Sequence, residues 1–161
     1  RNEDPGGAAG AESVGRAGPA YHLVDTVEAV ADAVSGVLVT PAVGMQRDED
    51  GFSYNRPGAG SVTALARGAA PDDVPVVGAF HNLPAGRLAD LDATFDWDTV
   101  VVGDDADAKR TVMDIAEGID GLRALDGGGL ANAMEVEAIT PLLINLAREN
   151  DDLHDLGVRF E

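Results

Sequence analysis

The sequence contains no cysteine at any of its 161 positions. This absence excludes disulfides, thiolate nucleophiles and metal sites with cysteine ligands. The sequence also lacks an apolar run long enough to cross a membrane, and no segment has the pattern of a signal peptide. These absences predict a cytoplasmic protein that does not enter a membrane.

Positive charge is scarce, because 11 Lys and Arg residues face 29 Asp and Glu residues, for a formal net charge of -18. Nucleic acid is excluded as a partner, since binding a phosphate backbone needs a basic face. The acidity fits an ordinary acidic protein or a protein adapted to a saline cytoplasm. We favour the saline cytoplasm, because at low salt such self-repulsion strains a chain of this size.

Familiar catalytic motifs are missing as well. The chain has no nucleophile elbow, no Walker loop and no zinc-binding pattern, so no catalytic acid, base or nucleophile is predicted. Five aspartates do cluster in sequence, and helix capping and solvated loops explain them better than a metal, since no histidine accompanies them at ligand spacing. These aspartates are Asp96, Asp98, Asp104, Asp105 and Asp107.

Two short apolar runs, residues 74–80 and 99–102, organise the chain. β-Branched runs of this kind, bounded by Pro and Gly, are typical of strands buried on both faces. In an open α/β sheet, ligands bind beyond the carboxyl ends of such strands. His81, Leu83 and Ala85 follow the first run and are predicted to face a ligand. The alternative for His81 is a structural, hydrogen-bonded histidine.

The remaining pattern is mainly helical. Pro41 ends a predicted strand over 37–40 and places Val43 at the strand's end. Residues 45–60 are predicted to form a polar loop, and Ser61 is predicted to cap the short helix that follows. The longest predicted helix, 130–149, is kinked at Pro141 and is apolar around most of its circumference, so we expect a second subunit to cover it. The expected helices are 21–34, 61–67, 104–120 with Asp104 as N-cap, and 130–149.

Several motifs, in the right order, resemble the NADPH-dependent reductases of the deazaflavin coenzyme F-420. The likeness runs from about Tyr21 to the end of the chain. The motifs are AFHNLPA at 79–85, FDWD at 95–98, VGDD at 102–105, IDGLR at 119–123, TPLL at 140–143 and LGVRF at 156–160.

This resemblance implies a cytoplasmic, homodimeric oxidoreductase that moves hydride between NADP and coenzyme F-420 in either direction. It also implies a Rossmann domain that holds NADP, with a smaller C-terminal part that helps cover the cleft. By position, Val43 and Ala85 match family residues that touch NADP. His81, Leu83 and Leu156 match residues at the contact between nicotinamide and deazaflavin.

The chain departs from the family at its beginning. The family starts with a strand, a G-x-G-x-x-G-like loop and a Ser-Arg pair for the 2′-phosphate, and none of these occurs here. Residues 5–18 are rich in Gly and Ala where an apolar strand is expected. We hypothesise that this segment is read out of frame in a truncated gene product. The strand 37–40 would then have an exposed edge, and the chain would bind NADP weakly or not at all.

The expected architecture is α/β: an incomplete Rossmann-like sheet that lacks its first strands, followed by a mainly helical C-terminal part. The expected division is a disordered or degenerate segment 1–20, the rest of an NADP-binding domain 21–103, and a helical deazaflavin-side and dimerisation region 104–161. Two alternatives remain open. One is another Rossmann dehydrogenase, such as a pyrroline-5-carboxylate reductase relative, and the other is a non-catalytic remnant that only dimerises.

Overall fold

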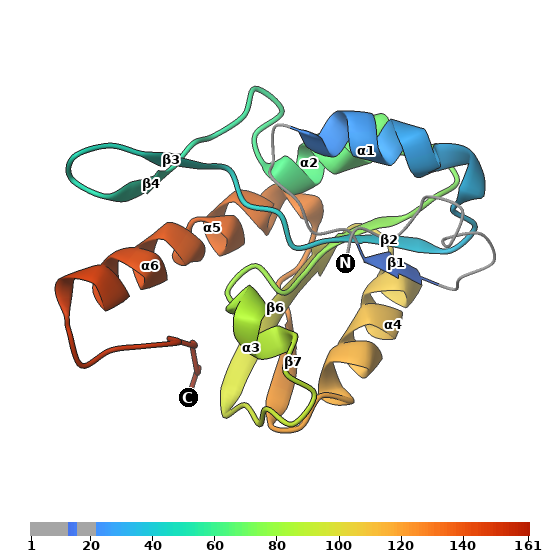
Figure 1. The fold of residues 1–161 in the computed structure, drawn as a ribbon. Coiled ribbons are helices and arrows are strands. Elements are labelled where there is room, and N and C mark those ends of the chain that lie inside the picture. Colours follow the sequence, from blue (N-terminus) through green and yellow to red (C-terminus); the bar gives the residue numbers. More distant parts are fainter. Residues whose placement is uncertain (1–12, 16–21) are drawn as a thin grey trace.

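The computed structural model describes residues 13–15 and 22–161 and contains a mixed five-stranded sheet (Figure 1). The strand order is β1-β2-β5-β6-β7, and every neighbouring pair is parallel except β5 and β6. The strands are β1 (Ser13–Gly15), β2 (Val37–Thr40), β5 (Val76–Gly78), β6 (Trp97–Gly103) and β7 (Leu122–Asp126). This partly parallel sheet with helices confirms the expected fold class.

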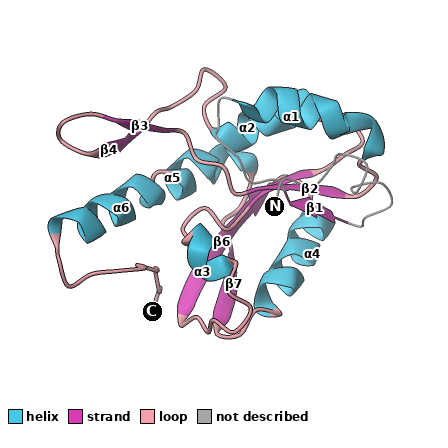
Figure 2. Ribbon diagram, viewed as in Figure 1, coloured by secondary structure: helices cyan, strands magenta, loops and turns pink. Residues whose placement is uncertain are grey.

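Helices cover both faces of this sheet (Figure 2). The helices are α1 (Leu23–Val30), α2 (Val62–Ala69), α3 (Ala85–Leu88), α4 (Ala106–Glu117), α5 (Ala133–Glu137) and α6 (Ile139–Glu149), with short 3-10 turns at Ala31–Ala33 and Leu130–Asn132. Within β2, Leu38 packs in the same apolar cluster as α1 and α2, whereas Val37 and Val39 join the cluster that contains α4. The strand is thus buried on both faces, as its continuous apolar sequence predicts.

Two predicted elements are confirmed closely. The strand over 37–40 has the expected bounds, and all four of its residues are buried. Ser61 is the N-cap of α2, because its Oγ accepts a hydrogen bond from the Ala64 N–H at 3.0 Å. The capping prediction succeeded because it depends on residues only three positions apart.

The prediction of an irregular loop over 45–60 was wrong. Residues in this segment form an antiparallel hairpin of β3 (Met45–Arg47) and β4 (Phe52–Tyr54). Gly51, at φ 130°, closes its turn, and the side-chain amide of Asn145 on α6 bonds both backbone groups of Phe52, at 2.9 and 2.7 Å. Three-residue strands carry little periodic signal, and the partner that holds them is distant in sequence.

The predicted start of the helix after β6 was wrong by one residue. Asp105, rather than Asp104, is the N-cap of α4, since Asp105 Oδ1 accepts from the Ala108 N–H at 2.8 Å. Asp104 instead accepts a hydrogen bond from the Leu130 N–H at 2.9 Å. Both aspartates have the right chemistry for a cap, and a contact distant in sequence decided between them.

The single kinked helix predicted over 130–149 was also wrong. The chain forms a 3-10 turn, α5 and α6, with a break at Ala138 that precedes Pro141. Pro141 lies in the first turn of α6, where a missing N–H removes no intrahelical hydrogen bond. Within this chain α6 is not buried from several sides, because Leu142 is 56% exposed and Leu146 is 40% exposed.

The edge of β2 that was expected to be exposed is paired. β1 lies parallel to β2, with Ser13 opposite Val37 and Gly15 opposite Val39. The rest of the segment 1–20, predicted to be irregular, lies outside the described residues. The predicted boundary at 103 stays a prediction, and the sheet continues beyond it through β7. Among the described helices, none combines the length and apolarity needed to span a bilayer.

Candidate functional site

A hollow of about 600 Å³ opens at one edge of the sheet. Because β2 and β5 are parallel, their carboxyl ends meet at this edge, and the antiparallel β6 begins beside them. The hollow is lined by residues that follow β2 and β5, by one side of α6 and by the segment after α6 that returns toward β6 (Figure 1). This is the position at which open α/β sheets bind their ligands.

All the predicted binding residues line this hollow. Val43 follows β2, while His81, Leu83 and Ala85 follow β5, and Leu156 reaches the hollow from near the chain's end. Residues from three separate parts of the sequence thus share one wall. That they contact a cofactor stays a prediction, and the structure establishes only that they lie together.

A strained backbone turn presents the residues that follow β5. Phe80 has φ 65°, a left-handed conformation that is rare for a bulky residue. Two hydrogen bonds hold this turn: the Phe80 N–H donates to Thr99 Oγ1 at 3.1 Å, and the Leu83 N–H donates to the Phe80 carbonyl at 3.2 Å. The turn directs His81 and Leu83 toward the hollow, and backbone strain of this kind often accompanies functional sites.

His81 is 3% exposed, and neither of its ring nitrogens has a hydrogen-bond partner among the described residues. Burial lowers the pKa of His81, while the Glu137 carboxylate and the carbonyls of Pro41 and Ala42 oppose this shift. The two interpretations of His81, as a ligand-binding residue and as a structural residue, both stay predictions, and its burial favours the neutral imidazole.

Asn82 is a lining residue that the sequence analysis missed. Its Nδ2 donates to the Asp98 carbonyl at 2.7 Å, and its Oδ1 is buried without a partner among the described residues. Buried polar atoms normally have a partner, so an unpaired acceptor at the wall of a hollow is suited to a ligand's N–H group. Its position directly after His81 was the available signal.

Glu137 is a second residue that the sequence analysis missed. It is fully buried, and its two carboxylate oxygens accept four hydrogen bonds. The donors are the Tyr54 hydroxyl at 2.6 Å, the Val62 N–H at 3.0 Å, the Thr63 N–H at 2.9 Å and the Thr63 hydroxyl at 2.8 Å. Burial, together with this carboxylate, raises the pKa of Tyr54.

The Glu137 carboxylate lies at the N-terminus of α2, where free N–H groups and the helix dipole favour an anion. With Glu137 and Ser61 bonded there, the first N–H groups of α2 are satisfied inside the protein. This helix terminus therefore has no free N–H groups for a phosphate. The available sequence signal was a pair of acids, Glu135 and Glu137, within an otherwise apolar segment.

Comparison with known proteins supports the same family as the motifs. No protein-family model matches the chain. The F-420-dependent NADP reductase of Methanothermobacter marburgensis is 44% identical over 85 residues, which are 53% of this chain and 38% of that protein. Its counterparts from Methanocaldococcus jannaschii and Methanothermobacter thermautotrophicus are 51% identical over 71 residues and 42% identical over 85 residues. These two matches cover 44% and 53% of this chain, but only 32% and 36% of the relatives.

Solved structures show the same fold. A provisionally named F-420-dependent NADP reductase from Arthrobacter sp. FB24 matches 96% of this chain and 71% of its own, with a TM-score of 0.81 and 21% identity. A hypothetical protein from Sinorhizobium meliloti has a TM-score of 0.62 and 26% identity, with 77% of this chain and 60% of its own covered. The pyrroline-5-carboxylate reductase of Coxiella burnetii has a TM-score of 0.56 and 16% identity, over 92% of this chain and 49% of its own.

The comparisons differ in what they support. The matches to the F-420-dependent NADP reductases support the family over a stretch that is about a third of those relatives' length. The likenesses at 21% and 16% identity establish the Rossmann-like fold alone. Within residues 13–15 and 22–161, no group of three His, Asp or Glu residues is arranged to hold a metal ion.

Proposed function

We propose that this chain forms the ring-binding part of an F-420-dependent NADP reductase, an oxidoreductase that transfers hydride between NADP(H) and coenzyme F-420. The observation that carries the proposal is the gathering of Val43, His81, Leu83, Ala85 and Leu156 around one hollow at the carboxyl edge of the sheet. The relatives named F-420-dependent NADP reductase support the proposal over the stretch that they share with this chain, which is about a third of their own length.

The residues of the hollow fit two stacked aromatic rings. Its volume, about 600 Å³, lies within the range of small-molecule sites, and its walls are mainly apolar. His81 and Asn82 line the hollow and have side-chain atoms without partners among the described residues, so they would supply the few polar groups that orient a ring. When bound, NADP(H) and the deazaflavin supply the hydride donor and acceptor.

The protein's own part is to hold and enclose the rings. Leu83, Ala85, Val43 and Leu156 would form dry walls that exclude water, and His81 would be a neutral polar anchor. Such a site works by fixing the distance and orientation of the rings, and it needs no strong acid or base.

We further propose that this chain binds NADP weakly. Its sequence contains no spaced-glycine phosphate loop, and the N-terminus of α2 already holds the Glu137 carboxylate. Both features remove places where a pyrophosphate could be bound. The rings would then contribute most of the affinity of this chain for the nucleotide.

Titration of the 161-residue chain with coenzyme F-420, followed by the coenzyme's absorbance, tests the proposal. We expect saturable binding that is lost in Leu83→Glu, since a carboxylate in the apolar wall is costly to desolvate. Leu91→Glu is the matched control, because Leu91 is 97% exposed. Absence of binding, or equal binding by both variants, would contradict the assignment. A parallel titration with NADP that gives micromolar affinity would contradict the proposal of weak NADP binding and would leave the ring-binding assignment unaffected.

The second candidate function is a non-catalytic remnant that only dimerises. The observation that favours it is the apolar face of α6, where Leu142 and Leu146 are exposed. We propose homodimerisation through this face under either function. A dimer that binds neither F-420 nor NADP would favour the remnant. Reduction of an imino acid substrate would instead favour the pyrroline-5-carboxylate reductase alternative.

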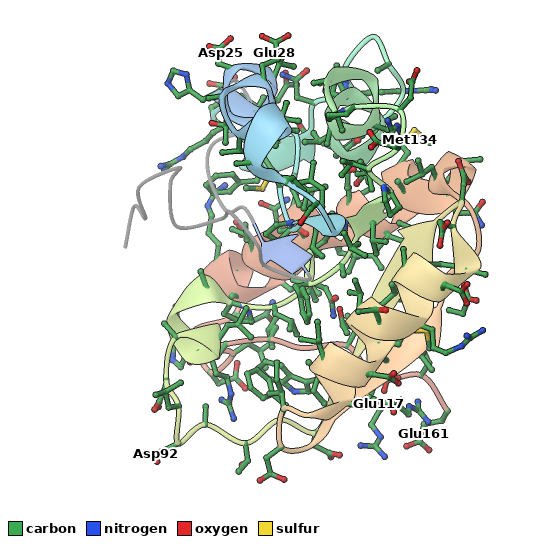
Figure 3. All side chains as sticks on the ribbon, turned by 90° about the vertical axis from the view of Figure 1, so that its right-hand side faces the viewer. Asp25, Glu28, Asp92, Glu117, Met134 and Glu161 are labelled. Carbon is green, nitrogen blue, oxygen red and sulfur yellow. The ribbon has the colours of Figure 1, made fainter. Side chains whose placement is uncertain are left out.

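We also propose that the protein works in a saline cytoplasm. Figure 3 shows the labelled acids Asp25, Glu28, Asp92, Glu117 and Glu161 at the periphery, with their carboxylates directed outward. All five side chains belong to exposed residues. Acidic groups on the outside remain hydrated in concentrated salt, while their mutual repulsion is screened.

A further inference from the structure

Three of the motifs that resemble the reductase family meet at one point of the fold. Asp98 of the FDWD motif has a fully buried side chain. Arg123 of the DGLR motif forms a two-pronged ion pair with it, in which Nε donates to Oδ1 and Nη2 donates to Oδ2, both at 2.7 Å. The third motif, residues 156–160, lies against this pair, and we call this segment the C-terminal strap.

Hydrogen bonds hold the C-terminal strap on the start of β6. The Asp98 N–H donates to the Val158 carbonyl at 2.7 Å, and the Phe160 N–H donates to Asp98 Oδ2 at 2.7 Å. Arg123 Nη2 also donates to the Phe160 carbonyl. The buried Asp98 and its half-exposed partner Arg123 thus bind both the N–H and the carbonyl of Phe160. Hydrogen bonds with an ionised partner are stronger than neutral ones.

Close packing holds the same segment. Gly157 lies so near the Trp97 ring that a Cβ added to it would lie 1.9 Å from the nearest ring atom. Only a residue without a side chain can approach the ring in this way, which explains the glycine. Arg159 also pairs with Asp96 beside Trp97. The C-terminal strap is therefore attached along its length.

The first residue of the C-terminal strap, Leu156, lines the hollow. Asp155 before it has φ 48°, so the chain turns sharply where the strap begins. No helix or strand contains Leu156, and its place in the wall depends on the attachment of the residues that follow it. If the strap left β6, the hollow would lose this part of its wall.

We propose that Asp98 and Arg123 are positioning residues, which dock the C-terminal strap on β6 and so place Leu156 in the wall of the hollow. The identity of what the hollow holds rests on the proposed function, whereas the docking itself does not. Release of the strap would open the hollow on this side, and docking would enclose it.

The test uses the 161-residue chain, with Trp97 as its only tryptophan and no cysteine. Leu156→Cys introduces a single thiol whose alkylation by neutral iodoacetamide reports the exposure of position 156. Quenching of Trp97 fluorescence by acrylamide reports the cover over the ring. Arg123→Ala removes the ion pair, and Gly157→Ala displaces the strap while leaving the pair intact. Arg110→Ala is the control, since Arg110 is exposed on α4 and pairs with the exposed Asp107 of the same helix.

We expect Arg123→Ala and Gly157→Ala each to raise the undocked population about tenfold or more. Arg123→Ala removes hydrogen bonds of the strap, and Gly157→Ala places a methyl group against the Trp97 ring. Alkylation and quenching should both increase. Arg123→Lys should give values between those of Arg123 and of Arg123→Ala, because lysine keeps the charge but loses the two-pronged geometry. Circular dichroism identifies the folded variants. If Arg123→Ala does not fold, Gly157→Ala carries the test.

The proposal would be overturned if Arg123→Ala and Gly157→Ala gave the same alkylation rate and the same Trp97 quenching as the control Arg110→Ala. Increased quenching without increased alkylation would overturn it too, because the strap would then leave β6 without moving position 156. If both readouts increase and the chain does not bind F-420, only the proposed function fails.

Discussion

The Glu137 carboxylate is expected to be among the most sensitive single groups in the protein. Glu137→Ala removes an acceptor of four hydrogen bonds and leaves the N–H groups of Val62 and Thr63, which are 1% and 0% exposed, without partners. Each buried orphan costs about 1–3 kcal/mol, and the lost interaction with the α2 dipole adds up to about 1 kcal/mol.

We therefore expect Glu137→Ala to lower the free energy of unfolding by about 2–7 kcal/mol, the combined cost of the two orphaned N–H groups and the lost dipole interaction. A domain's total stability is about 5–15 kcal/mol, so the variant is close to unfolding at moderate temperature. Glu137→Gln separates charge from volume, because its amide keeps the shape and one acceptor oxygen but directs an NH2 group at one of the two backbone N–H donors. It should lose part of the same free energy.

Equilibrium unfolding in urea, followed by circular dichroism, measures these differences. Glu135→Ala and Glu135→Gln are matched controls, since Glu135 lies on the same helix and is exposed. A difference below about 1 kcal/mol between Glu137→Ala and Glu135→Ala would refute the reasoning, because exposed substitutions alone vary by that amount.

Three further outcomes are expected. Arg123 holds the pKa of Asp98 below its ordinary value, so the stability that this ion pair contributes is complete above about pH 4 and declines as the pH falls further. Acrylamide quenching of Trp97 should rise in this acid range, and Asp98→Asn should remove the rise. Sedimentation equilibrium should show a dimer for the wild type and for the control Leu91→Glu, and a monomer for the double variant Leu142→Glu with Leu146→Glu. A wild-type monomer would contradict dimerisation through α6. Finally, the melting temperature should rise with KCl, as the screening length falls from about 10 Å at 0.1 M to about 3 Å at 1 M; a melting temperature that does not change would contradict salt adaptation.

Local chemistry in the sequence predicted the central strands and the place of the site. The continuous apolar residues of β2 require burial on both faces, and Ser61 marks the start of α2 through a contact three residues away. A strand that ends at Pro41, and another followed by His81, also placed the candidate residues at the carboxyl edge of a sheet. These inferences hold because each depends on neighbours in sequence.

Only the tertiary structure decided which distant groups meet. Asn145 pairs with Phe52 to hold the hairpin, Glu137 bonds the start of α2, and Arg123 binds Asp98 beneath the C-terminal strap. Each pair joins residues far apart in the chain, and no local pattern distinguishes these side chains from other acids, amides and cations. The sequence by itself therefore determined the central strands and the sheet edge at which the candidate residues lie, whereas long-range contacts decided which side chains surround that edge and hold it.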